Sequence, residues 1–252
     1  MQDQMTAIYL WHIGNTYLSE ELLPAALPET ERERILSISD RKEQRRKIGA
    51  QLLLHTILNR LHGIKDPRIS RDGWGRPFLT DHPGLSIGIS HSGDYVMCGT
   101  GLQHQDIGLG IDIEAPLGAE WRSLRSFLAP EEISILKEAP PRTCTDLLSR
   151  LWVCKEAYLK ALGFGLSGNP SEIAIDPGPP ETAESAVFPG RLIFPSGKAA
   201  RGIPPGAEIV RSPFSRGVEL SAGKIGEYHF AVCLPSRFLM PQIAVIAALR
   251  EI

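Results

Sequence analysis

The sequence predicts an α+β fold, because a long helix-forming segment is followed by several short strand-forming segments and the order then begins again. Residues 41–61 carry apolar side chains at helical spacing. The short strand-like runs after them lie around residues 69 and 78 and over 85–89 and 95–100, with glycine and proline between them. A second strand-like run begins at Gly108, and this mixture of elements is typical of α+β proteins.

The other elements follow from the same patterns. We expect a first strand over residues 7–13 and a short amphipathic element over 19–23. In the second half we expect a strand ending at Glu114, then helices over 130–137 and about 145–162. Five further strands are expected near residues 173–175, 192–194, 207–211, 218–220 and 228–234.

Two segments near the end of the chain lie outside the candidate catalytic motifs. Residues 176–190 are rich in proline and small polar residues, which favours an exposed loop. Over residues 238–252 we expect a short helix after Pro241 that packs on the second half, and the alternative is an apolar tail that binds a partner.

Composition limits the classes of function. The chain has 252 residues, of which 42% are hydrophobic and 22% charged, as expected for one large or two small globular domains. Its formal charge of -2 and scattered basic residues give no electrostatic case for nucleic acid. The four cysteines lack metal-ligand spacing, which favours free thiols in the cytoplasm. We expect neither a signal peptide at residues 1–10 nor a membrane span, because the apolar run at 243–249 is too short.

Two acidic side chains share one face of the strand that ends at Glu114. Alternate side chains of a strand point the same way, so Asp112 and Glu114 face together while Ile111 and Ile113 face a core. Such pairs are common on exposed strands, where water solvates them. The apolar, glycine-rich residues 105–111 instead favour a buried strand, in which carboxylates need a cation or hydrogen-bond donors. The pair is therefore a candidate half of a site for a hard divalent cation.

A helix further along the chain offers a third acid and a lysine. Trp152, Glu156 and Lys160 recur at a spacing of four and form one stripe of the helix. The alternative is an ordinary surface ion pair between Glu156 and Lys160, worth a few tenths of a kcal/mol. The surrounding residues are mostly apolar, and a buried helix should not carry charges without a function. If strand and helix meet, three carboxylates can hold a divalent ion beside a phosphate-binding lysine, which indicates phosphate-transfer chemistry.

These two motifs together resemble the 4'-phosphopantetheinyl transferases, specifically the two-lobed surfactin-type enzymes. The motifs read Gly-Ile-Asp-Ile-Glu over 110–114 and Trp-x-x-Lys-Glu-Ala-x-x-Lys-Ala over 152–161. Ser-His-Ser over 90–92 and Gly-Arg-Pro-Phe over 75–78 are similar to further segments of that family, and the likeness runs from about residue 27 to about 166. The resemblance implies two similar lobes related by pseudo-two-fold symmetry, residues 1–105 and 106–252, with the active site in the cleft between them, in a monomer.

The resemblance also implies a reaction. The family transfers 4'-phosphopantetheine from coenzyme A to a serine of an acyl, peptidyl or aryl carrier protein, with Mg²⁺, and releases 3',5'-ADP. The positions that match the metal ligands are Asp112, Glu114 and Glu156. Glu156 or a metal-bound water would accept the serine proton, and Lys160 would stabilise the leaving phosphate. Asp112, Glu156 and Lys160 are thus the expected catalytic residues.

Coenzyme A would be bound by residues before the metal site. By resemblance, Ser90 and His91 contact its nucleotide and phosphates, and Arg76 and Pro77 lie along the adenine. A lone histidine or a basic helix end is more often structural, so these roles rest on the resemblance. With Lys160, the expected coenzyme A-binding residues are completed by Arg45 and Arg46, which lie where the family carries a helix of the 3'-phosphate site; Arg46 itself aligns with a 3'-phosphate contact.

The chain departs from the family pattern at two places. Thr30 and Glu33 stand where relatives can carry lysines that hold the 3'-phosphate, so either Arg32 or Arg34 replaces them, or Arg46 carries more of the contact. Glu132 falls near an acid proposed in some members to assist catalysis, although an acid at the start of a helix also favours the helix dipole. Two other functions remain open: a coenzyme A or carrier-protein binding module without catalysis, and a metal-dependent pyrophosphate hydrolase.

Overall fold

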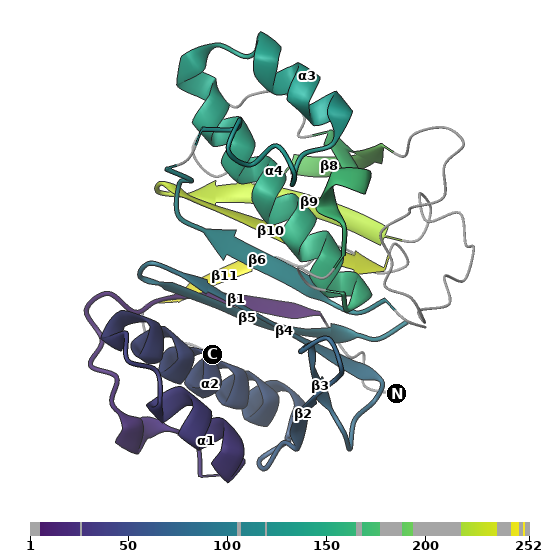
Figure 1. Cartoon of the computed structure of the whole chain (residues 1–252). Helices are drawn as coiled ribbons and strands as arrows, with labels where there is room; N and C mark the ends of the chain where they lie inside the picture. The colour runs from purple at the N-terminus through teal and green to yellow at the C-terminus, as the bar shows by residue number, and fades with distance from the viewer. Residues whose placement is uncertain are drawn as a thin grey trace.

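The computed structural model of this chain describes residues 6–25, 27–104, 107–118, 120–164, 168–176, 188–193, 218–235, 243–246 and 249. It has a mixed α+β fold, as the sequence predicts. Two β-sheets lie one against the other, and a long helix covers the outer face of each (Figure 1). None of the described helices is both long and apolar enough to cross a membrane.

The first sheet, here called the N-terminal sheet, has the strand order β11-β1-β5-β4. Its outer face packs on α2 (Arg41–His62) through a core that includes Leu53, Ile57 and Val96. Asp40 caps the start of α2 by accepting hydrogen bonds from the backbone of Lys42 and Glu43. The strands are β1 (Ala7–His12), β4 (Leu85–Ser92), β5 (Tyr95–Leu102) and β11 (Ile243–Ile246).

The second sheet, here called the C-terminal sheet, has the order β6-β10-β9-β8-β7. Its outer face packs on α4 (Pro141–Leu162), and α3 (Pro130–Glu138) lies beside that helix (Figure 1). The strands are β6 (Gly110–Glu114), β7 (Ala174–Asp176), β8 (Phe188–Ile193), β9 (Val218–Ile225) and β10 (Tyr228–Pro235). Every strand pair within this sheet is antiparallel.

Alternation of side chains along the strands buries both faces of each sheet. Ile8 and Met97 of the N-terminal sheet meet Ile111, Ile113 and Phe230 of the C-terminal sheet in a common core. The side chains between these positions face the helices instead. Because the isoleucines of β6 face this core, Asp112 and Glu114 point to the other side, as the period of two predicts.

A close approach of α4 to β6 brings the helix motif to the strand motif. A Cβ atom at position 110 would overlap the carbonyl oxygen of Ala157, so only glycine lets the two elements pack this closely. Ala157 and Ala161 keep that face of the helix small, and both are fully buried. Glu156 and Lys160 are thereby carried next to Asp112.

Several sequence predictions need correction. Residues 243–246 form a strand parallel to β1 in the N-terminal sheet, so the expected helix on the second half is wrong there and the chain returns to the first sheet. The expected loop at 176–190 ends in β8, which begins at residue 188. Helix α1 (Glu29–Leu36) and the 3-10 turn Pro170–Glu172 were not expected. The strand expected at 207–211 and the boundary near residue 105 lie outside the described residues.

Candidate active site

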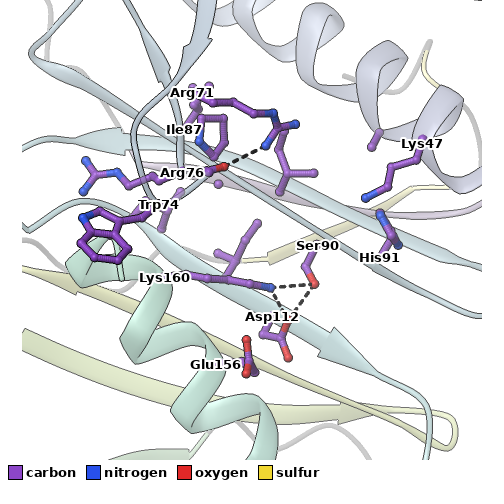
Figure 2. A pocket seen from close by; sticks show the side chains of 18 of the residues that line it. Lys47, Arg71, Trp74, Arg76, Ile87, Ser90, His91, Asp112, Glu156 and Lys160 are labelled. Carbon is purple, nitrogen blue, oxygen red and sulfur yellow. Dashed lines mark hydrogen bonds and ion pairs between the residues drawn. The ribbon is translucent and has the colours of Figure 1, made fainter. Parts of the chain in front are cut away.

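A pocket of about 410 Å³ is lined by residues from both sheets and from α1, α2 and α4. Eight residues that the sequence predicts for the site line it together: Arg76, Pro77, Ser90, His91, Asp112, Glu114, Glu156 and Lys160. Their arrangement is drawn in Figure 2, where Lys160 extends from α4 toward Ser90 and Asp112. The two carboxylate motifs therefore meet, although about forty residues separate them in sequence.

Asp112 is the most deeply buried acid of the pocket, with a relative exposure of 2%. Its Oδ1 accepts a hydrogen bond from Lys160 Nζ at 2.5 Å and another from Ser90 Oγ at 2.8 Å. Glu114, two residues along the strand, accepts a hydrogen bond from Ser92 Oγ at 2.8 Å. Glu156 lies beside Asp112 in Figure 2 and is 6% exposed.

Burial and mutual repulsion make the pocket acids harder to ionise. Burial raises the pKa of Glu156 to about 7; Lys160 opposes this shift, and Asp112 and Glu114 add to it. Burial also raises the pKa of Glu114, and the charge of Asp112 raises it further. The single positive charge of Lys160 therefore does not balance three carboxylates, and another cation in the pocket would lower the pKa of each of them.

The donors of this cluster fit Mg²⁺. Asp112 Oδ2 and Glu156 Oε1 are both buried and have no hydrogen-bond partner. Buried oxygens without a partner are costly, and oxygen ligands are those that Mg²⁺ prefers. Within the described residues, no three His, Cys, Asp or Glu side chains are already gathered in metal-binding geometry. The ammonium group of Lys160 contacts Asp112 at 2.5 Å and balances part of its charge.

A second wall of the pocket is basic and comes from α2 and β4. Lys47 and His91 both line it and face the same space in Figure 2. Burial lowers the pKa of His91 to about 4, with Lys47 contributing in the same direction and Glu43, 3.8 Å away, opposing. At neutral pH His91 is therefore an uncharged imidazole, which can donate a hydrogen bond to an anion without carrying charge.

Two arginines form the end of the pocket nearest α1. Arg34 makes two hydrogen bonds of 2.7 Å to Glu31, and Arg71 donates to the same carboxylate at 3.1 Å. Their hydrogen bonds to one carboxylate hold the two guanidinium groups side by side, and both line the pocket. The sequence left open whether Arg32 or Arg34 replaces the missing lysines. Arg32 instead donates to the carbonyl of Pro24, so Arg34 is the arginine that reaches the site.

The β-hairpin of β2 (Ile69–Arg71) and β3 (Pro77–Leu79) carries Arg71, Trp74 and Arg76 to the pocket. Asp72 Oδ1 accepts hydrogen bonds from the backbone of Trp74 and Arg76 at 2.9 Å, and Gly75 adopts a positive φ of 84°. Trp74 remains 44% exposed and lies edge-on to Phe164, just after α4. A flat apolar surface therefore stands at the pocket next to the arginines.

Two predicted residues do not line the pocket. Arg45 donates to the backbone carbonyls of Ile13, Gly14 and Thr16, so its guanidinium group holds a loop together. Arg46 pairs with Glu43 at 2.9 Å, and its charge lowers the pKa of both Glu114 and His91. Lys47 is the residue of this run that lines the pocket, and the coenzyme A-binding roles of Arg45 and Arg46 stay predictions.

Glu132 has a structural role here instead of lining the pocket. Its two oxygens accept hydrogen bonds from the backbone nitrogens of Ala129 and Ile175, and Oε2 also lies 2.6 Å from Lys155 Nζ. Lys155 donates further to the carbonyl oxygens of Phe127 and Pro170. Lys155, which precedes Glu156 in the helix motif, therefore belongs to a buried hydrogen-bond network outside the pocket.

Sequence reasoning placed Trp152 on the stripe of Glu156 and Lys160 but did not predict Lys47, Arg71 or Trp74 as pocket residues. Helical phase could have found Lys47, because it lies four residues after Glu43, which pairs with it at 3.5 Å. Trp152 lies on the same stripe as Glu156 and stacks on Phe127 with ring centroids 4.2 Å apart. No local pattern marks Arg71, because its approach to Glu31 depends on tertiary packing.

Comparison with known proteins agrees with this geometry. Residues 108–193, which include β6 and all of α4, match the 4'-phosphopantetheinyl transferase superfamily. The chain is 29% identical over 189 residues to the 4'-phosphopantetheinyl transferase HetI of Nostoc sp., an alignment that covers 71% of this chain and 78% of that relative.

Two further relatives are less completely covered. The 4'-phosphopantetheinyl transferase Sfp of Bacillus subtilis is 28% identical over 151 residues, or 59% of this chain and 65% of the relative. The L-aminoadipate-semialdehyde dehydrogenase-phosphopantetheinyl transferase of Schizosaccharomyces pombe is 31% identical over 166 residues, or 56% and 64%. The chain thus spans just under two thirds of the length of these two relatives.

Proposed function

We propose that the protein transfers 4'-phosphopantetheine from coenzyme A to a serine of a carrier protein, and the match of residues 108–193 to the 4'-phosphopantetheinyl transferase superfamily supports this proposal. The observation that carries this proposal is the meeting of Lys160, Asp112 and Glu156 in one pocket with basic side chains on its other walls. A substrate with a pyrophosphate and a further phosphate needs positively charged groups that bind its phosphates. It also needs acidic groups that bind a cation and accept a proton.

The anionic parts of coenzyme A would lie along the basic walls. Arg34 and Arg71, both hydrogen-bonded to Glu31, suit the 3'-phosphate. One guanidinium group can donate hydrogen bonds to two oxygens of the same phosphate. Lys47 and the neutral His91 would contact phosphate from α2 and β4. Arg76, whose guanidinium donates to Gln103 at 2.7 Å, would lie along the adenine together with Pro77.

Asp112, Glu114 and Glu156 would hold Mg²⁺ near the pyrophosphate, since two of them offer buried oxygens without a partner. A bound Mg²⁺ would supply positive charge that stabilises the pyrophosphate as its phosphoanhydride bond breaks. Lys160 would meet the same phosphates and stabilise the charge that develops on the leaving 3',5'-ADP. Ser90 donates to Asp112 and accepts from Lys160 Nζ at 3.4 Å, so it helps to hold the carboxylate and the ammonium group in place.

The proton of the carrier serine would pass to Glu156. Without a cation its pKa is about 7. A bound cation would lower this pKa and keep the carboxylate ionised, and an ionised carboxylate can accept the proton. The serine oxygen forms a bond to the phosphorus nearest the pantetheine, and the bond from that phosphorus to the bridging oxygen breaks. The electron pair leaves with 3',5'-ADP, and the serine proton remains on Glu156.

The finer architecture is part of the proposal. We take residues 1–105 and 106–252 as two lobes related by a pseudo-two-fold axis, with the exception of β11, which joins the first sheet. Each sheet packs on one long helix, α2 or α4, and this likeness supports the pair of lobes. The site would lie in the cleft between them, in a cytoplasmic monomer that meets its acyl, peptidyl or aryl carrier protein as substrate.

The test is intact-mass analysis of purified apo carrier proteins incubated with coenzyme A, Mg²⁺ and the protein. We expect the carrier to gain one phosphopantetheine with the wild type and none with the Glu156→Gln variant. Coenzyme A binding by both proteins, measured by calorimetry, is the control for folding. If neither acyl, peptidyl nor aryl carriers gain mass while coenzyme A still binds, the transferase assignment is wrong.

A further inference from the structure

Three serine hydroxyls of β4 join the two sheets at their edges. Among the described strands, β4 is the last of the N-terminal sheet and β6 is the last of the C-terminal sheet, so each has one edge that pairs with no other described strand. Ser86, Ser90 and Ser92 accept hydrogen bonds from the backbone nitrogens of β6 and its flanking residues. These bonds are Leu109 N to Ser86 at 2.8 Å, Ile113 N to Ser90 at 3.3 Å and Ala115 N to Ser92 at 3.0 Å.

The pattern has a simple geometric cause. Alternate residues of β4 point to one face, and positions 86, 88, 90 and 92 are serine, glycine, serine and serine. A Cβ at Gly88 would lie 2.9 Å from Ile111 Cγ1, so the absence of a side chain at Gly88 makes room for Ile111 of β6. The serine hydroxyls thus replace the carbonyl oxygens that a neighbouring strand would offer, and buried N–H groups of β6 are not left without acceptors.

Two of the three serines do more than join backbones. Ser90 Oγ donates to Asp112 Oδ1 at 2.8 Å, and Ser92 Oγ donates to Glu114 Oε2 at 2.8 Å. In each case the carboxylate belongs to the residue just before the backbone nitrogen that the same hydroxyl accepts from. Each of these serines therefore fixes both the strand and the acid that the strand carries. Among the described hydrogen bonds, Ser86 contacts β6 through the nitrogen of Leu109.

We propose that Ser92 is a positioning residue that holds Glu114 in the orientation required for cation binding, and so links the metal site to the docking of the two sheets. The inference rests on the proposed metal site. Glu114 is partly exposed at the pocket, where a carboxylate without a donor can turn toward water. The hydroxyl of Ser92 donates to Oε2 of Glu114, so Oε1 of the same carboxylate can bind a cation.

Ser86 supplies a matched control. Ser92→Ala and Ser86→Ala each remove one hydroxyl that accepts from a backbone nitrogen next to β6, so both should lower the unfolding midpoint. Only Ser92→Ala also frees a pocket carboxylate. Ser92→Thr keeps the hydroxyl and should behave as the wild type.

The experiment measures Mn²⁺ binding by electron paramagnetic resonance on the full chain with coenzyme A present, with no turnover required. We expect Ser92→Ala to weaken Mn²⁺ affinity about 10-fold, Ser86→Ala to leave it unchanged and Ser92→Thr to restore it. Unchanged affinity in Ser92→Ala would overturn the inference, and so would an equal loss in Ser86→Ala, since sheet docking alone would then explain both. A wild type that binds no Mn²⁺ would instead overturn the metal site itself.

Discussion

Lys155 Nζ lies 2.6 Å from Glu132 Oε2, and neither side chain is exposed to solvent. The pair joins α4 to the start of α3, and backbone groups satisfy the remaining oxygen and two further protons. Lys155 and the catalytic candidate Glu156 are neighbours in sequence, yet their side chains leave the helix about 100° apart, one toward Glu132 and the other into the pocket. Helix α4 therefore stabilises the fold through Lys155 and contributes Glu156 to the reaction site.

Breaking this pair should cost stability and leave the chemistry intact. Glu132→Gln leaves the Lys155 ammonium group buried without its counter-charge, which should lower the free energy of unfolding by about 3–5 kcal/mol. Denaturant unfolding measures the change, with the exposed Glu138→Gln on the same helix as control. Per folded molecule, the rate of carrier modification should equal that of the wild type. A large loss of this rate in fully folded protein would show that Glu132 assists catalysis after all.

Lys160 should act through its charge in the transition state. Lys160→Met keeps the aliphatic stem and removes the ammonium group that contacts Asp112. We expect kcat to fall by about 100-fold or more, as when one stabilising donor is removed from a reaction site. Single-turnover formation of holo carrier at saturating coenzyme A gives the rate. The exposed Lys137→Met is the control, and an unchanged kcat in Lys160→Met would contradict the role.

The paired arginines should govern affinity for coenzyme A. Arg71→Ala removes a guanidinium group from the end of the pocket, so KM for coenzyme A should rise by about 10-fold or more with a smaller change in kcat. Arg68→Ala is the matched control, because Arg68 precedes the same β-hairpin and is 79% exposed. Steady-state kinetics at fixed carrier concentration separates the two. Equal KM values for Arg71→Ala and the wild type would place the phosphate elsewhere.

A cluster away from the pocket should make stability depend on acid. Asp146 on α4 accepts hydrogen bonds from His229 of β10 at 2.9 Å, Lys224 of β9 at 3.1 Å and Arg150 of α4 at 3.2 Å. The hydrogen bond from His229, followed by that from Lys224, lowers the pKa of Asp146 well below its ordinary value of 3.8. A lowered folded-state pKa stabilises the protein fully above that ordinary value, and the contribution is lost as the pH falls toward the lowered pKa.

The wild type should therefore exceed Asp146→Asn in unfolding free energy at pH 7, and the difference should shrink as the pH falls below about 4. Denaturant unfolding of both proteins between pH 7 and pH 3 measures it. A difference that stays constant over this range would mean that Asp146 does not titrate with a lowered pKa.

The sequence predicted the parts of the site that depend on local periodicity. The period of two put Asp112 and Glu114 on one face, and the period of the helix put Glu156 and Lys160 on one stripe. The period of two also marks Ser86, Ser90 and Ser92, but a strand pattern does not say which edge those serines meet. Contacts between distant segments could not be predicted, such as Arg71 with Glu31 or β11 with β1. The contacts of Arg45 with backbone carbonyls also depend on tertiary packing and have no sequence signal, and its expected role in coenzyme A binding stays a prediction.

The most direct test of the central claim is the amount of 3',5'-ADP released from coenzyme A and Mg²⁺, measured by chromatography with and without an apo carrier protein. A transferase that uses the carrier serine as nucleophile should release one 3',5'-ADP for each holo carrier formed, and almost none when the carrier is absent or its serine is replaced by alanine. Release at the same rate without a carrier would show that water is the nucleophile, and the protein would then be a pyrophosphate hydrolase.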